Sequence, residues 1–111
     1  MKKILSFLKE LFTDCFLNKN DYCYKRLENE PEFYKNKTIY IISEEEFEWV
    51  IMFKCPCGCN EKIKLNLLES SKPKWTYFIK DKNISIFPSV ERVNGCKSHF
   101  IVNKGYIEWS E

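Results

Sequence analysis

The chain has 111 residues, the length of one modest domain, and its net charge of +2 comes from 18 basic and 16 acidic residues spread along the sequence. No block of like charge is dense enough to predict nucleic-acid binding. No stretch approaches the roughly 20 apolar residues that a membrane span requires. We therefore expect a small protein that neither binds nucleic acid nor spans a membrane, and whose limited core would gain from a metal or other staple.

The first 37 residues (1–37) predict an amphipathic helix followed by a connecting arm. Apolar residues between Ile4 and Phe16 recur at helical spacing, and polar residues fall on the opposite side. Pro31 breaks any second helix, so the polar and aromatic residues before Thr38 are interpreted as the arm. Charged residues interrupt the apolar run and no small-residue cleavage site follows, so we expect a cytoplasmic protein rather than a secreted one.

The period of the hydrophobic pattern switches to two in residues 38–111, which predicts a β domain. Phe47, Trp49, Ile51 and Phe53 share one side of a strand, and shorter alternating runs follow at 63–67, 75–79, 84–86, 100–102 and 106–109. Turn-like residues join these runs as hairpins. We expect a mainly β fold, a small antiparallel β-sandwich or open barrel preceded by the N-terminal helix. Most aromatic residues occupy alternating strand positions and are interpreted as core residues.

Five residues with metal-binding side chains gather in two short segments. The segment Cys55-Pro-Cys-Gly-Cys59 lies between two predicted strands, where Gly58 can adopt the positive φ that turns backbone amides toward thiolates. The later segment, Gly95-Cys-Lys-Ser-His99, also begins with a glycine that permits a turn. Two ligand groups on two loops are the usual way in which a small domain builds a tetrahedral metal site. The candidate ligands are Cys55, Cys57, Cys59, Cys96 and His99.

Five candidates for four positions leave the ligand set open. The preferred set is Cys55, Cys57, Cys96 and His99, because a Cys-x-Cys pair then faces a Cys-x-x-His pair. Cys59 is the spare thiol in that set, and sets with Cys59 in place of Cys55 or Cys57 fit nearly as well. Thiolate and imidazole ligands favour structural zinc. The alternative is an iron–sulfur cluster, since the two segments look like the cluster-binding loops of Rieske proteins.

Residues 38–109 resemble a family of small bacterial proteins. The matching features are Cys55-Pro-Cys-Gly-Cys59, the Lys-Leu-Asn-Leu67 strand, Trp75, Phe87-Pro-Ser-Val90, Gly95-Cys-Lys-Ser-His-Phe100 and Gly105-Tyr-Ile-Glu-Trp109. Genes of that family are often found beside ubiquitin-like proteins and relatives of the ubiquitin-activating and ubiquitin-conjugating enzymes. The resemblance implies a role in a bacterial ubiquitin-like modification pathway, with a protein partner from that pathway.

Three functions remain open at this point. We expect a zinc-stabilised binding or accessory module that recognises a ubiquitin-like protein or its activating or conjugating enzymes, rather than an enzyme. The first alternative is a peptidase-like hydrolase of ubiquitin-like conjugates, with Cys59, Ser89 or Ser98 as candidate nucleophile. Ser98 adjoins His99, but neighbours on a strand point to opposite faces, which argues against a dyad from that pair. The second alternative is a Rieske-like electron-transfer protein.

Overall fold

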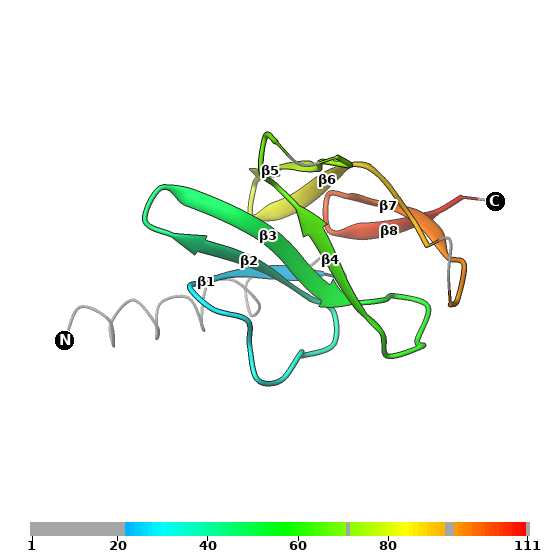
Figure 1. Cartoon of the computed structure of the whole chain (residues 1–111). Coiled ribbons are helices and arrows are strands. Elements are labelled where there is room, and N and C mark those ends of the chain that lie inside the picture. The colour runs from blue at the N-terminus through cyan, green and yellow to red at the C-terminus, as the bar shows by residue number, and fades with distance from the viewer. Residues whose placement is uncertain (1–21, 71, 93–94, 111) are drawn as a thin grey trace.

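The computed structural model describes residues 22–70, 72–92 and 95–110, which form two four-stranded β-sheets (Figure 1). The first sheet contains, in order, β1 (Cys23–Leu27), β2 (Thr38–Glu44), β3 (Phe47–Lys54) and β4 (Lys62–Asn66). The second contains, in order, β5 (Thr76–Lys80), β6 (Asn83–Glu91), β7 (His99–Asn103) and β8 (Tyr106–Trp109). The mainly β fold is therefore confirmed. The predicted N-terminal helix lies outside the described residues, and no helix able to cross a membrane occurs within them.

One hydrophobic core fills the space between the two sheets. Phe53 of β3 and Phe100 of β7 are fully buried and meet edge to face, with ring centroids 6.2 Å apart. Each sheet keeps its own edge strands, so the fold is a sandwich and not a closed barrel. The remaining buried side chains of this core include Ile39, Ile41, Ile51, Ile63 and Leu65 from the first sheet and Ile84, Ile86, Val90 and Val102 from the second.

The β1 strand departs from the expected architecture in two ways. It lies within the stretch interpreted as a connecting arm, and it pairs with β2 in parallel, with Cys23 opposite Thr38. All other strand pairs are antiparallel, as predicted. Lys25 and Arg26 at the centre of β1 obscure its alternation in the sequence. The division of the chain at residue 37 into an arm and a β domain stays a prediction.

Several aromatic side chains that were interpreted as core residues are exposed. Phe47 is 65% exposed and Trp49 43%, although both alternate in phase with the buried Ile51 and Phe53. Phe78 is 49% exposed because it occupies the outer face of β5. Alternation predicts which face of a strand a side chain occupies, but not whether another sheet covers that face at that point. The interpretation is therefore wrong for these residues and for Phe87, Tyr106 and Trp109.

The β6 strand is longer than predicted and contains an irregularity. Ile86 pairs with Val102 and Val90 pairs with Phe100, so β6 advances four residues while β7 advances two. Such a bulge leaves extra residues unpaired and can redirect a side chain. The bulged residues are Phe87, Pro88 and Ser89, which places Ser89 immediately before the point where regular pairing with β7 resumes.

Candidate metal centre and serine–histidine pair

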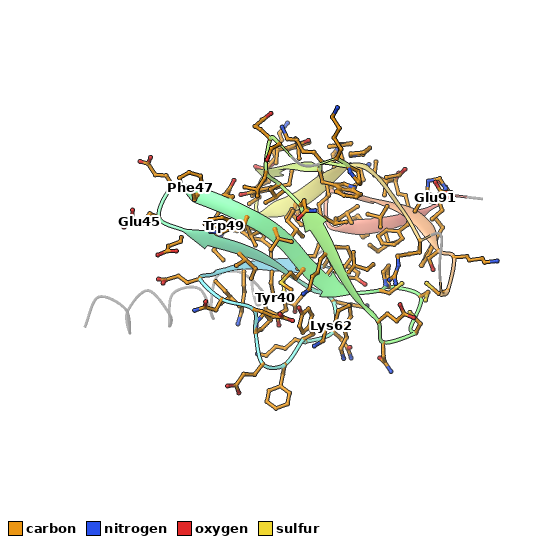
Figure 2. All side chains as sticks on the ribbon, viewed as in Figure 1. Tyr40, Glu45, Phe47, Trp49, Lys62 and Glu91 are labelled. Carbon is orange, nitrogen blue, oxygen red and sulfur yellow. The ribbon has the colours of Figure 1, made fainter. Side chains whose placement is uncertain are left out.

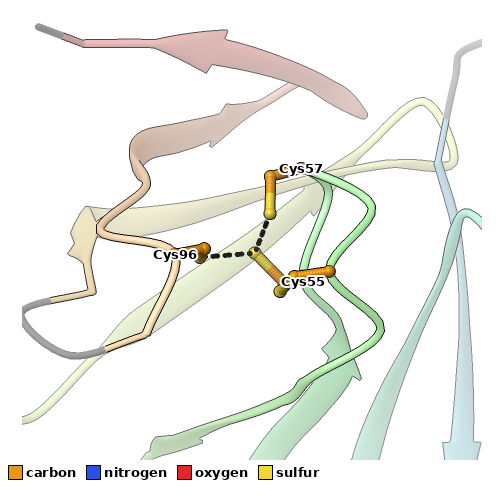
Figure 3. A group of neighbouring side chains, drawn as sticks. Cys55, Cys57 and Cys96 are labelled. Carbon is orange, nitrogen blue, oxygen red and sulfur yellow. Dashed lines mark hydrogen bonds between the residues drawn. The ribbon is translucent and has the colours of Figure 1, made fainter.

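Two loops bring four thiols together at one end of the sandwich. The β3–β4 loop carries Cys55, Cys57 and Cys59, and the loop between β6 and β7 carries Cys96. The four sulfur atoms all lie within 4.8 Å of one another. Cys55 Sγ lies 3.4 Å from Cys57 Sγ and 3.6 Å from Cys96 Sγ, with the side chains converging on one point (Figure 3). Residues far apart in the sequence thus form one compact cluster.

Local backbone geometry holds the two loops in this arrangement. The amide of Cys55 donates to the carbonyl of Glu61 at 2.8 Å, which closes the β3–β4 loop. Gly58 has a φ of +93° and Gly95 a φ of +73°, so the predicted positive φ at both turns is confirmed. A Cβ atom on Gly95 would lie 3.0 Å from the Glu61 carboxylate, so the two loops are in close contact at this point.

The environment gives the thiols different proton affinities. Burial raises the pKa of the Cys55 thiol to about 12. Hydrogen bonding with the Ser98 side chain lowers the pKa of the Cys96 thiol to about 6, and the two side chains lie 3.2 Å apart. The same hydroxyl lowers the pKa of Cys57. A bound cation would let all four thiols, including the buried Cys55, be thiolates together.

The donor set fits a single tetrahedral metal ion. Zinc bonded to four thiolates at about 2.3 Å separates the sulfur atoms by about 3.8 Å, and the spacings around Cys55 are close to that value. Arg92 supplies a positive charge beside the cluster. Burial opposes the charge on Arg92, but its bond to Glu61 and the thiolates of Cys55 and Cys96 raise its pKa. Its buried Nη1 has no hydrogen-bond partner within the described part of the chain.

His99 does not belong to this cluster. Its Nε2 atom lies 3.0 Å from the hydroxyl of Ser89, on the outer face of the second sheet. The expected set of Cys55, Cys57, Cys96 and His99 therefore differs from the four residues that the fold brings together, which include Cys59 instead. His99 begins β7, and its strand geometry turns the imidazole toward β6 rather than back toward Cys96.

The two candidate serines have separate positions. Ser98 is buried, and its hydroxyl contacts the sulfur atoms of both Cys55 and Cys96. Ser89 is partly exposed, and its carbonyl accepts a hydrogen bond from the Trp75 indole N–H at 3.4 Å. Sequence reasoning named both serines but did not pair Ser89 with His99. The available signal was the β6–β7 hairpin, which places residues ten apart in the chain on facing strands.

A serine hydroxyl in hydrogen-bond contact with an imidazole is the arrangement of a general base and its nucleophile. Glu91 lies directly opposite His99 in the strand register, and both occupy the outer face of the sheet. Val90 and Phe100, the next pair in the register, point into the core. One outer surface of the sandwich thus presents a hydroxyl, an imidazole and a carboxylate.

Fold and site define a small β-sandwich with a four-thiol group that can hold a metal ion and a separate serine–histidine pair. The chain belongs to the family described as the bacterial ubiquitination-like system serine protease (BubE), whose model matches residues 26–110. This membership confirms the resemblance to a family from ubiquitin-like systems. No curated protein and no solved structure matches the chain.

Proposed function

We propose that the protein is a serine hydrolase that cleaves a bond at a carbonyl carbon of a polypeptide from a bacterial ubiquitination-like system. The observation that carries the proposal is the 3.0 Å contact between Ser89 Oγ and His99 Nε2. The name of the family, which includes the words serine protease, supports the same reaction class. The expectation of a binding module without catalysis then becomes the second candidate function.

Each residue has a defined part in the proposed reaction. Ser89 Oγ attacks the scissile carbonyl while His99 Nε2 accepts the hydroxyl proton. His99 returns that proton to the leaving group, and the acyl chain stays bonded to Ser89. A water molecule then attacks the same carbonyl carbon, with His99 again accepting and returning the proton. This step frees Ser89 and releases the acyl chain as a carboxylic acid. Glu91 is the proposed positioning residue, because opposite side chains in an antiparallel pair lie close enough for its carboxylate to orient the imidazole.

The proposed role of the metal is structural. Cys55, Cys57, Cys59 and Cys96 can fill all four positions of zinc, which leaves no position for a reactive water. Zinc is preferred to a Rieske-like cluster, because that cluster needs two histidines and the only histidine of the chain contacts Ser89. Bound zinc would neutralise the thiolates and tie the loops together.

The test uses a fluorophosphonate, which bonds covalently to an activated serine hydroxyl. The native protein should be labelled on Ser89, and Ser89→Ala should lose the label. His99→Ala should slow labelling by at least about a hundredfold, in line with the contribution of a general base. Ser43→Ala is the matched control, since Ser43 is partly exposed and belongs to β2 of the first sheet, whereas the dyad lies on the second. Equal labelling of native protein and Ser89→Ala would contradict the proposal.

A second experiment separates catalysis from binding. The substrate is a linear fusion of a ubiquitin-like protein of such a system to a reporter, incubated with native protein or Ser89→Ala. Cleavage by the native protein alone supports the hydrolase. Tight binding by both proteins without cleavage by either would support the second candidate, a binding module.

A further inference from the structure

A pair of stacked phenylalanines lies on the same outer face as the dyad. Phe78 of β5 and Phe87 of β6 have ring centroids 5.6 Å apart with an interplanar angle of 13°. Both rings are exposed, by 49% and 37% respectively. Exposed aromatic rings do not contribute the free energy of stabilisation that burial would provide. An exposed stacked pair on this face is therefore a candidate binding surface.

Phe87 and Ser89 are neighbours on one face of β6. Ile86 and Val90 are buried in the core, whereas Phe87 is exposed and Ser89 is partly exposed. The proposed nucleophile is thus two residues from an exposed apolar surface formed by Phe87 and Phe78.

The direction of the substrate follows from the position of the general base. His99 is opposite Glu91, so it lies on the side of Ser89 that is remote from Phe87 along β6. The base must also return its proton to the leaving group, which therefore lies on the His99 side. The acyl portion of the substrate then extends in the other direction, over Phe87 and Phe78.

We infer that Phe78 and Phe87 form the binding surface for an apolar side chain in the acyl portion of the substrate, within about two residues of the scissile carbonyl. This inference rests on the proposed hydrolase function. It assigns a substrate class: an extended polypeptide tail whose last few residues include an aliphatic or aromatic side chain. Burial of such a side chain against two rings favours the apolar substrate over a polar one by about tenfold or more.

The experiment compares two peptidyl diphenyl phosphonates, acetyl-Leu-Leu-Gly and acetyl-Ser-Ser-Gly, in which phosphorus replaces the scissile carbonyl carbon. In the labelling step a bond forms between Ser89 Oγ and phosphorus, and one bond from phosphorus to phenoxide breaks. The hydroxyl proton passes through His99 to the departing phenol. Intact-protein mass spectrometry measures the second-order rate constant for each reagent.

The native protein should react at least about tenfold faster with the leucine reagent. The double variant Phe78→Ala/Phe87→Ala should reduce this preference to about twofold or less, and so should the milder Phe78→Ser, which changes only a side chain of the edge strand. The matched control is Phe47→Ala/Trp49→Ala, which removes the other exposed stacked pair and should keep the preference.

Two results would overturn the inference, and a third would instead overturn the proposed function. Equal rates of the two reagents with native protein would show that no apolar side chain is bound near Ser89. A leucine preference that survives in both Phe78 variants would place the binding surface elsewhere. Labelling that persists in Ser89→Ala would contradict the proposed nucleophile, whatever the preference between reagents.

Discussion

His99 illustrates how side-chain direction decides the role of a residue. Its spacing from Cys96 predicts a shared metal site, yet its imidazole contacts Ser89 across the β6–β7 pair. Cys96 belongs to the thiol cluster and His99 to the pair with Ser89, because Cys96 lies in the β6–β7 loop and His99 in β7. Ser98, between them, contacts the thiols and faces away from the dyad.

We predict that His99→Ala retains the metal ion and loses the reactivity of Ser89. Four thiols remain to fill the coordination positions in this variant. Elemental analysis of the untagged protein should give one metal ion per chain in both native protein and variant. The control is Cys96→Ser, which should lower the metal content. A metal-free His99→Ala protein with intact sheets would instead make the imidazole a ligand.

We predict that Ser98→Ala shifts acid-induced metal release to higher pH. In the native protein the pKa of Cys96 is lowered from 9.0 to about 6, with the Ser98 hydroxyl as the largest cause, so protons compete with the metal at Cys96 only near and below that pH. Without the hydroxyl the pKa rises, and protons compete at higher pH. A colorimetric zinc chelator at graded pH measures the release midpoint. Ser43→Ala, on β2 of the first sheet, should leave that midpoint unchanged.

Among the elements, the β6–β7 loop connects the two sites. It leaves β6 just after Glu91, contributes Cys96 to the thiol cluster and enters β7 at His99. The amide of Arg92 donates to the carbonyl of Ser98 at 2.8 Å, which ties the two strands together between the sites. A metal ion bound at Cys96 would therefore fix the start of β7, and with it the position of the imidazole.

Metal removal should consequently reduce the reactivity of Ser89. We expect chelation to slow fluorophosphonate labelling by about tenfold or more, because small displacements of a catalytic group have effects of that size. Far-ultraviolet circular dichroism should show that the sheets persist, since most of the core lies between them. Restoring zinc should restore the rate. An unchanged rate in the metal-free, folded protein would mean that the loop holds His99 without the ion.

At the scale of the whole molecule, two kinds of contact join the sheets. The first is the buried core around Phe53 and Phe100. The second is a polar network at the surface, in which Arg26 of β1 donates to Glu48 of β3 at 2.8 Å and to the hydroxyl of Tyr77 in β5 at 2.9 Å. Figure 2 shows the side chains that fill the space between the sheets.

These contacts should differ in their contribution to stability. Phe53→Ala is expected to lower the free energy of unfolding by about 3–5 kcal/mol, because it leaves a cavity in the core. Tyr77→Phe should lower it by less than about 1 kcal/mol, because the network is partly exposed and solvent screens its charges. Urea denaturation of the metal-loaded proteins measures both values. Comparable losses would mean that the surface network, rather than the core, holds the sheets together.

The amino-acid sequence predicts much of this architecture. Period-two alternation locates most strands, since one side of each strand must be buried, and the crowded cysteines locate the thiol cluster. Glycines at positions 58 and 95 mark the two loops, because their positive φ is a local property of the backbone. The hydrophobic pattern does not predict the polar β1, because β1 is a strand through its pairing with β2 and not through its own alternation.

Only the tertiary structure decides which chemistry each side chain takes part in. Sequence spacing alone cannot distinguish His99 as a metal ligand from His99 as the partner of Ser89, since strand pairing and the bulge in β6 determine where the imidazole points. Exposure of Phe78 and Phe87 likewise depends on what covers the outer face of the second sheet. The sequence by itself determined most of the strands and the thiol-rich loops, which are local properties. The contacts between distant residues, on which the proposed reaction depends, exist only in the folded chain.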